Sequence, residues 1–472
     1  MKTPTAGDSN VPAINFPGTL LLLINPGNFT RHCLMDMRDA AARLGVRTLT
    51  IEIGEVWALH QSGQRIDPDN LAKALRDHDV RAALGYTLNG LCEWPCDTGS
   101  NGQPRSFFER LGIPHLMWWT DHPHWASEKY ALSPELQPLL ASPNCRHFVK
   151  SAFAADELHD VLGWANCFGL PIAENPDRLR PAHAIAPAYD VVAVMGSPPN
   201  AYAAVERFLG EDDPPLEAML GEISIGVADR LSALWTTKAP RELLTELSAL
   251  GREWADTRRR EWLTASHRIF RRIEPAYPRA ARWLRDNYRV YFDAIEALWE
   301  FGRWQRTFYV RYLARYFRVG VFGSNWSSVG LGAAAWVNHD DQTTAYADGR
   351  IALNVSQAGD EEGIAHKPFE IAAAGVPMLH IHRRGLSDCF TPGVEVEIFD
   401  TPREAREKAE ALLSDPARRS AMAHAALQRL RGEHTWTHRL AQLLIRAGVA
   451  AAKPTSFADE AVSPLRRCPA PA

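Results

Sequence analysis

The sequence predicts an α/β protein with two lobes, each built on a parallel sheet, and a helical insertion in the second lobe. Residues 14–180 alternate apolar runs of strand length with helical patterns, which is typical of a parallel sheet covered by helices on both faces. The same alternation returns after residue 318. A stretch rich in proline and charge, residues 169–187, separates the two regions and suits a linker or a long crossing loop.

The first lobe is predicted over residues 14–187. The apolar run 18–25 predicts its first strand, and Pro26–Gly27 predicts a turn before a helix over 29–44. The later predicted strands are 47–53, 81–88, 114–120 and 145–149, and the later predicted helices are 69–77, 106–111 and 152–162. Ligands of parallel sheets gather at the carboxyl ends of strands. Asp121, His122 and His124 follow such an end and are therefore candidate site residues.

The second lobe is predicted over residues 188–437, starting with a strand over 189–195. Residues 201–317 are almost wholly helical in pattern and dense in arginine and tryptophan. We expect a helical insertion whose aromatic side chains pack internally and whose arginines face water; a basic, aromatic surface for an anionic partner or a membrane is the alternative. The remaining predicted strands are 318–322, 352–355, 377–382 and 396–399, and the remaining predicted helices are 401–413 and 416–430.

The chain is predicted to close with a helical segment over 438–450 and a disordered tail over 451–472, which is rich in Ala, Pro and Ser. The composition, 46% hydrophobic and 23% charged, is that of a globular protein, and the formal net charge of −4 argues against nucleic acid as a partner. We expect no membrane span, because no apolar run approaches about 20 residues. Seven scattered cysteines and a start without signal-peptide order predict a cytoplasmic location.

The segment HKPFEIAAAG, residues 366–375, is the most informative local motif. Pro368 suits the first turn of a helix, and Gly375 suits its end. His366 and Lys367 place positive charge at the helix N-terminus, which typically costs about 0.3–1 kcal/mol unless an anion lies there. Free N–H groups and cations together form a phosphate site, and Glu370 is placed to accept hydrogen bonds from ribose hydroxyls. A nucleoside diphosphate matches this pattern; a helix start with Lys367 in solvent is the purely structural alternative.

Several segments together resemble a known family. They are HKPFEIAAAG with its Phe369–Glu370 pair, a PGVEVEIF strand, a DTPREAR helix pair, a closing HTWTHR segment, GSNW at 323–326, TDHPHW at 120–125 and LPIAENP at 170–176. The chain resembles the CgeB-type (spore maturation protein) GT-B glycosyltransferases over most of 15–200 and 318–445. The resemblance implies two Rossmann-like lobes that face a cleft. It does not account for residues 201–317.

The resemblance also implies an activity, the transfer of a sugar from a nucleotide-sugar donor, UDP- or GDP-linked, to an acceptor of unknown identity. The second lobe would bind the donor and the first lobe the acceptor, without a metal ion or another cofactor. Glu362 and Glu370 are separated by seven residues, the Glu-x7-Glu pattern of many retaining GT-B enzymes. Lys367 stands where an arginine is common in these relatives, so the bidentate geometry of arginine is lost.

For this chemistry we assign Lys367, His366 and the N–H groups around Pro368–Glu370 to the leaving diphosphate, whose developing charge must be stabilised. If the reaction inverts the anomeric centre, Asp121 is the candidate base. His122 and His124 are its alternates. The corresponding structural alternatives are a loop-capping carboxylate and two packed imidazoles.

Phe369 and Glu362 are also assigned to donor binding, and three further residues are assigned to it more weakly. Asn325 and Trp326 follow a predicted strand and are candidates to line the base or sugar pocket, although Trp326 suits the core equally well. Asp388 is a candidate contact to the donor sugar.

Two other functions fit the same sequence. One is a non-catalytic GT-B-like binding protein in surface or coat assembly, which would bind nucleotide without turnover. The other is a sugar-nucleotide epimerase, which would act without an acceptor. A Rossmann dehydrogenase is disfavoured because INPGNF, after the first strand, lacks the GxGxxG pattern.

Overall fold

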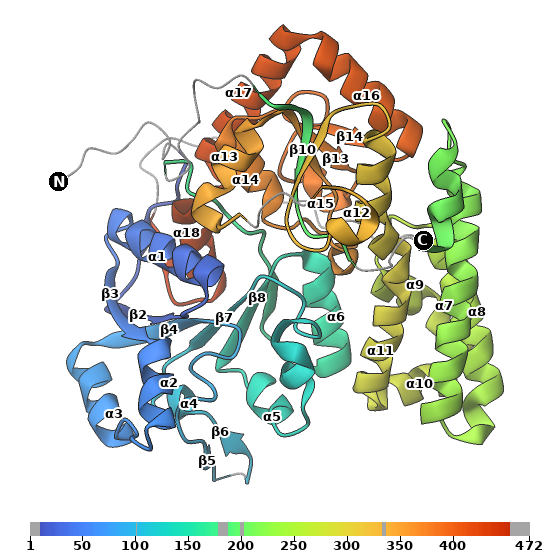
Figure 1. Ribbon diagram of the computed structural model, residues 1–472. Helices are drawn as coiled ribbons and strands as arrows, with labels where there is room; N and C mark the ends of the chain where they lie inside the picture. Colours follow the sequence, from blue (N-terminus) through green and yellow to red (C-terminus); the bar gives the residue numbers. More distant parts are fainter. Residues whose placement is uncertain (1–9, 101, 178–186, 199–202, 333–336, 454–472) are drawn as a thin grey trace.

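Two parallel sheets organise the computed structural model, which describes residues 10–100, 102–177, 187–198, 203–332 and 337–453. The first sheet has six strands in the order β3-β2-β4-β7-β8-β9, and the second has five in the order β11-β10-β12-β13-β14. The first sheet belongs to the blue-to-teal lobe of Figure 1, and the second lies within the lobe that ends in orange and red. The predicted fold class, α/β with two Rossmann-like lobes and a helical insertion in the second, is confirmed.

The strands of the first lobe form because short apolar runs are covered on both faces by helices. The strand β2 is buried at every position, as expected in a parallel sheet. The strands are β2 (Thr19–Ile24), β3 (Arg47–Glu52), β4 (Val80–Tyr86), β7 (His115–Trp119), β8 (Cys145–Val149) and β9 (Cys167–Gly169). The helices are α1 (Asn28–Arg43), α2 (Ile53–Gln61), α3 (Pro68–Asp77), α4 (Phe107–Arg110), η1 (Ala126–Leu132), α5 (Gln137–Leu140) and α6 (Ala152–Leu162). The sequence did not predict α2 or β9. A short hairpin joins β5 (Asp97–Thr98) to β6 (Pro104–Arg105).

The second lobe repeats this arrangement. Its strands are β10 (Tyr189–Val194), β11 (Val319–Phe322), β12 (Gly349–Asn354), β13 (Met378–Ile381) and β14 (Glu397–Phe399). Its helices are η5 (Ser327–Val329), η6 (His339–Asp341), α13 (Gln342–Ala347), η7 (Ala358–Asp360), α14 (Lys367–Ala374), α15 (Arg384–Ser387), α16 (Pro402–Ser414) and α17 (Pro416–Glu433). The central strand β10 pairs in parallel with β11 and β12. The carboxyl ends of these strands therefore share one edge of the sheet.

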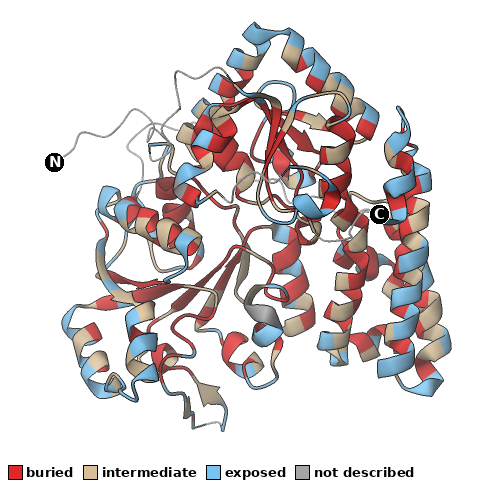
Figure 2. Cartoon of the chain, viewed as in Figure 1, coloured by how far each residue is buried: buried red, intermediate tan, exposed pale blue. Residues whose placement is uncertain are grey.

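The insertion forms the helical wall on the right of Figure 1. Its helices are η2 (Ala203–Gly210), α7 (Leu216–Lys238), η3 (Arg241–Leu243), α8 (Leu244–Arg260), α9 (Ser266–Ile273), η4 (Glu274–Ala276), α10 (Pro278–Asp286), α11 (Tyr288–Leu298) and α12 (Glu300–Leu313). Its tryptophans Trp235, Trp254 and Trp304 are fully buried, which confirms that its aromatic side chains pack internally. Figure 2 shows the buried positions on the inner faces of these helices and the exposed positions on their outer faces.

The end of the described chain returns to the first lobe. Helix α18 (Trp436–Arg446) packs against α1, and the Trp436 ring meets that of Trp118 at 5.4 Å between centroids. The strand β15 (Ala451–Ala452) pairs antiparallel with β1 (Ile14–Asn15). The predicted disorder over 451–472 is therefore wrong for these two residues, because backbone hydrogen bonds to β1 order them. Residues 454–472 of that prediction lie outside the described part. None of the described helices has the length and apolar character that crossing a membrane requires.

Candidate functional site

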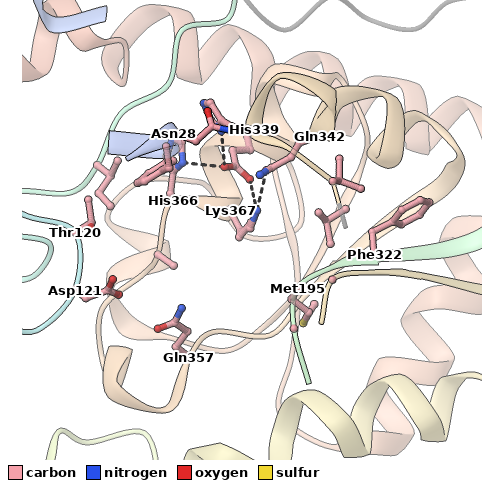
Figure 3. A pocket seen from close by; sticks show the side chains of 18 of the residues that line it. Asn28, Thr120, Asp121, Met195, Phe322, His339, Gln342, Gln357, His366 and Lys367 are labelled. Atoms are coloured by element: carbon pink, nitrogen blue, oxygen red, sulfur yellow. Dashed lines mark hydrogen bonds and ion pairs between the residues drawn. The ribbon is translucent and has the colours of Figure 1, made fainter. Parts of the chain in front are cut away.

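A pocket of about 410 Å³ lies between the two lobes (Figure 3). This volume is within the range of small-ligand sites, roughly 300–1,000 Å³. The first lobe contributes Asn28, Phe29, Tyr86, Thr120, Asp121 and Lys150 to its lining. The second lobe contributes, among others, Arg306, Phe322, Gln357, His366, Lys367 and Glu370. The pocket is thus placed at the carboxyl ends of strands from both sheets, where parallel sheets bind ligands.

Helix α14 brings the HKPFE motif to the pocket as the sequence predicts. Pro368 lies in its first turn, and Gly375 ends it with a left-handed backbone, φ 68°. His366, Lys367 and Glu370 all line the pocket. Figure 3 shows His366 and Lys367 beside His339 and Gln342, with dashed contacts between these side chains and their neighbours.

The Glu370 carboxylate is the centre of a buried polar network. Its Oε2 atom accepts hydrogen bonds from Lys367 Nζ at 2.8 Å and from the Tyr346 hydroxyl at 3.2 Å. Its Oε1 atom lies 2.9 Å from His366 Nδ1 and 3.6 Å from His339 Nδ1. Burial favours the neutral acid, but Lys367 and His366 outweigh burial and hold the pKa of Glu370 well below its usual range. The carboxylate is therefore ionised in the folded protein.

His366 connects Glu370 to the segment that crosses between the lobes. Its Nε2 atom lies 2.9 Å from the carbonyl oxygen of Ala173 and 2.9 Å from Glu174 Oε2. Burial opposes the imidazolium form, but the carboxylates of Glu174 and Glu370 outweigh burial and raise the pKa of His366 to about 10. The positive charges at the start of α14 are thus met by protein carboxylates when no ligand is present.

One part of the predicted phosphate site is wrong. The backbone N–H groups of Phe369 and Glu370 both donate to the carbonyl of His366, at 3.0 and 3.3 Å. The first turn is tightened in this way, as is common at helix ends. These two groups are therefore not free for an anion, and the side chain of Lys367 remains as the contribution of α14.

Two cations that the sequence did not single out complete the pocket, the half-buried Arg306 and the buried Lys150. The Arg306 side chain reaches it from α12 and donates from Nε to the carbonyl of Val355 at 2.9 Å. Within the described part of the chain, its terminal Nη groups make no hydrogen bond. Burial lowers the pKa of Arg306, and Asp360 and Asp121 partly offset this effect. Lys150 forms ion pairs with Asp360 and, at 3.4 Å, with Asp121.

Glycines shape the second-lobe edge of this pocket. Gly196 and Gly323 line it after β10 and β11. Gly323 has φ +145°, and a Cβ atom there would lie 2.5 Å from the carbonyl oxygen of Met195. No larger residue fits this close approach of the two strand ends.

Asp121 lies where the sequence places it, after β7, and lines the pocket from the first lobe. Its side chain is 40% exposed. The two alternates lie outside the pocket lining. His122 is buried with Nε2 3.0 Å from Glu157 Oε2, and His124 is stacked on the ring of Phe292. Packing against α6 and the insertion, rather than the proximity of these histidines to Asp121 in sequence, decides where they point.

The remaining predicted donor residues also lie outside the pocket lining. Glu362 accepts a hydrogen bond from the backbone N–H of Ala265 in the insertion at 2.8 Å. Phe369 is buried against the ring of Phe390, and Asp388 is exposed after α15.

Asn325 and Trp326 of the GSNW segment were predicted to line the base or sugar pocket, and neither belongs to the pocket lining. Trp326 is core, because it is fully buried and its indole N–H donates to the carbonyl of Met195 at 2.6 Å. Asn325 is exposed and has φ +67°, a left-handed conformation that asparagine tolerates.

One region of the chain, which includes part of the pocket lining, matches a known protein family. Residues 305–445 match the family described as "Glycosyl transferase-like". The matched region, under a third of the chain, contains Arg306 and the whole of α14. It is therefore glycosyltransferase-like in sequence. No curated protein matches the chain.

Solved structures give weaker similarities. A glycosyltransferase from Rickettsia africae is 9% identical, with a TM-score of 0.41, over 92% of this chain and 98% of that one. Anabaena HepE in complex with UDP-glucose is 10% identical, with a TM-score of 0.42, over 91% and 99%. AviGT4, a glycosyltransferase of avilamycin A biosynthesis, is 13% identical, with a TM-score of 0.40, over 92% and 99%. These TM-scores are all below 0.5, so the similarities say nothing about the function of the chain outside residues 305–445.

Proposed function

We propose that the protein is a glycosyltransferase that binds a nucleotide-sugar donor, UDP- or GDP-linked, in the pocket between its lobes and transfers the sugar to an acceptor. The observation that carries this proposal is the convergence of Lys367, Glu370 and Arg306 on one pocket at the strand ends of the second lobe. The glycosyl transferase-like match over residues 305–445 supports it. A CgeB-type subfamily and a cytoplasmic location are parts of the proposal.

Donor binding requires an exchange of partners at Glu370. Lys367 is the more exposed partner, because its side chain is 22% exposed while that of Glu370 is 2% exposed. We infer that the Lys367 ammonium moves from Glu370 Oε2 to the donor diphosphate. The carboxylate oxygen that it leaves can then accept hydrogen bonds from the ribose hydroxyls. The other oxygen, Oε1, keeps its contact with His366.

The diphosphate is placed between Lys367 and Arg306. In glycosyl transfer the bond between the anomeric carbon and the phosphate oxygen breaks through an oxocarbenium-like state. The electron pair of that bond stays on the leaving diphosphate. Arg306 is half-buried and offers its uncommitted Nη donors inside the pocket, where they stabilise this charge more strongly than in water. No metal ion in contact with the diphosphate is required.

The acceptor side is assigned to the first lobe, with Asp121 facing the pocket. In an inverting reaction Asp121 takes the proton of the acceptor hydroxyl while the acceptor oxygen bonds to the anomeric carbon. Lys150, 3.4 Å from Asp121, holds the carboxylate in place.

A thermal-shift and calorimetry screen against UDP, GDP, ADP and CMP tests donor binding. We expect one nucleoside diphosphate to raise the melting temperature and to bind with a stoichiometry of one per chain. Release of nucleoside diphosphate from the matching nucleotide-sugar then tests turnover. Binding without release would favour a non-catalytic binding protein, and a free epimer formed without acceptor would favour an epimerase. Absence of binding to all four nucleotides would refute the proposal.

Replacing Asp121 by asparagine should lower the rate of transfer by on the order of 10²–10⁴-fold, the usual contribution of a positioned base. Donor affinity should stay within about twofold, because Asp121 faces the pocket from the first lobe. Asp69→Asn is the matched control, since Asp69 is exposed on α3. The rate of nucleoside diphosphate release and the donor Kd are the measurements. Full activity of the Asp121 variant would eliminate this residue as the base.

A further inference from the structure

We propose that Glu174 is a positioning residue of the donor site, which holds the His366 imidazole against Glu370 so that Glu370 turns its other oxygen to the ribose. Glu174 belongs to the LPIAENP segment, residues 170–176, which the resemblance singles out without giving it a role. Its side chain is 0% exposed, and those of His366 and Glu370 are 7% and 2% exposed. The inference rests on the proposed donor site and adds to it a residue from the segment that crosses between the lobes.

Both nitrogens of the His366 ring face oxygen acceptors. Nε2 lies 2.9 Å from Glu174 Oε2 and 2.9 Å from the carbonyl oxygen of Ala173. Nδ1 lies 2.9 Å from Glu370 Oε1. A neutral imidazole carries one N–H, so its second nitrogen would turn a lone pair toward an oxygen. Both contacts are favourable together only when the ring is protonated on both nitrogens.

Glu174 supplies the negative charge that keeps the ring in this form. Glu370 already faces a second cation, the Lys367 ammonium. With Glu174 the buried group contains two carboxylates and two cations, so its charges balance, as buried charges require. Burial, the largest influence, opposes the imidazolium, but Glu174 and then Glu370 outweigh it and raise the pKa of His366 to about 10.

Backbone contacts fix Glu174 where it can orient the ring. Its N–H donates to the carbonyl of His434 at 3.2 Å, and its Oε1 atom accepts from the Asn175 N–H at 2.7 Å. The Asn175 side chain in turn donates to Asp36 on α1 at 3.0 Å. The remaining oxygen, Oε2, faces His366. Supporting contacts of this kind hold the groups that touch a ligand in their productive geometry.

The ring divides the two oxygens of Glu370 between two tasks. Oε1 is held by His366, while Oε2 accepts hydrogen bonds from Lys367 and from the Tyr346 hydroxyl. When the Lys367 ammonium moves to the diphosphate, Oε2 gains a free acceptor position for the ribose. The contact of Oε1 with His366 keeps the carboxylate from rotating away during this exchange.

Other titratable or charged side chains surround this ring. His339 lies 3.6 Å from Glu370 Oε1 through Nδ1 and 4.0 Å from Glu174 Oε2 through Nε2. The others are Lys367 on α14, Tyr346 on α13 and, beyond His339, His32 on α1; Arg306, Asp121 and Lys150 line the same pocket. All of these groups are kept in the Glu174 variants, so a pH dependence that differs between parent and variant reports on Glu174.

Replacing Glu174 by glutamine removes the charge and keeps the size of the side chain. The pKa of His366 should fall into the neutral range, because burial then opposes a charge that Glu370 alone supports. The measurement is titration of the ring by NMR in the full-length protein, with its signal assigned by its absence from His366→Gln. The ring should stay charged beyond about pH 8.5 in the parent protein and lose its proton between about pH 6 and 8.5 in the variant.

Nucleotide affinity should follow the charge of the ring. The probe is whichever of UDP, GDP, ADP and CMP binds the parent protein. By calorimetry, the Kd of Glu174→Gln should lie within about threefold of the parent value at about pH 6 and be at least about tenfold weaker at about pH 8.5. The ratio of the two Kd values cancels the titration of the nucleotide itself. Inorganic pyrophosphate, which has no ribose, should bind both proteins alike at the higher pH, since the variant has then lost one charge of each sign.

Glu157→Gln is the matched control, because Glu157 is also buried and its Oε2 atom lies 3.0 Å from a histidine, His122, outside the pocket lining. Its Kd ratio to the parent protein should not change with pH. Glu174→Asp keeps the charge and should recover most of the affinity at the higher pH.

A His366 ring that is uncharged at neutral pH in the parent protein would overturn the inference, and this result does not require Glu174→Gln to fold. A folded Glu174→Gln variant with the parent's pH dependence of Kd would overturn it as well, while leaving the proposed function intact. Absence of nucleotide binding by the parent protein would instead refute the proposed donor site, and this inference with it.

Discussion

Replacing Arg306 by methionine is expected to lower the rate of nucleoside diphosphate release from the donor by on the order of 10²–10³-fold, as loss of one preorganised donor does in other enzymes. Arg306 lines the pocket, its Nε is held by the carbonyl of Val355, and its terminal nitrogens are uncommitted in the described part of the chain. Methionine keeps the length of the side chain and removes the charge. Single-turnover rates and the affinity for inorganic pyrophosphate are the measurements, and both should fall.

The matched control is Arg303→Met on the same helix. Arg303 pairs with Glu300 at 3.0 Å outside the pocket lining, so this change should cost no more than a partly exposed ion pair, about 0–1 kcal/mol of stability. Arg306→Lys should recover part of the rate because charge returns without the guanidinium fork. If Arg306→Met turns over like the parent protein, the leaving group is stabilised elsewhere and Arg306 has a packing role.

Replacing Glu370 by glutamine should weaken nucleoside diphosphate binding by about 10–100-fold, because a hydrogen bond to a charged group contributes about 1.5–3 kcal/mol. Glutamine fills the same volume, so α14 keeps its packing. Affinity for inorganic pyrophosphate, which has no ribose, should change much less. Calorimetry with the nucleotide and with pyrophosphate separates the two roles, since Arg306→Met affects both ligands and Glu370→Gln mainly the first.

Glu404→Gln is the control for Glu370→Gln. Glu404 also lies in the first turn of a helix, α16, where it accepts the backbone N–H of Asp400 at 2.9 Å. This change should alter stability slightly and nucleotide affinity not at all. Unchanged nucleotide affinity in folded Glu370→Gln would remove ribose recognition from this site.

Local sequence patterns predicted most of the elements because each depends on neighbours in the chain. The apolar run of β2 is buried at every position, and α14 begins near Pro368 and ends at Gly375 as expected. Several elements escaped prediction, among them α2, β9 and α13. Helix α2 follows β3 without a break, and β9 has three residues, too few to produce a pattern.

Some residues of the candidate site were likewise predicted from local patterns, and others were missed. His366, Lys367 and Glu370 were predicted because one helical turn brings them together, and Asp121 because it follows a strand end. Arg306 and Lys150 were missed, since one is an arginine among many in a helical region and the other follows an ordinary strand. Only the contact between lobes shows that both face the same pocket.

The sequence by itself determined the α/β class, the two lobes, the helical insertion and the helix that carries Lys367 and Glu370, because backbone periodicity and turn chemistry are local properties. The tertiary structure alone decided which charged side chains meet. It turned His122 and His124 toward α6 and the insertion, placed Trp326 in the core, and brought Glu174 and His339 to His366. Contacts across long sequence separations depend on how the lobes pack, and no short motif encodes that packing.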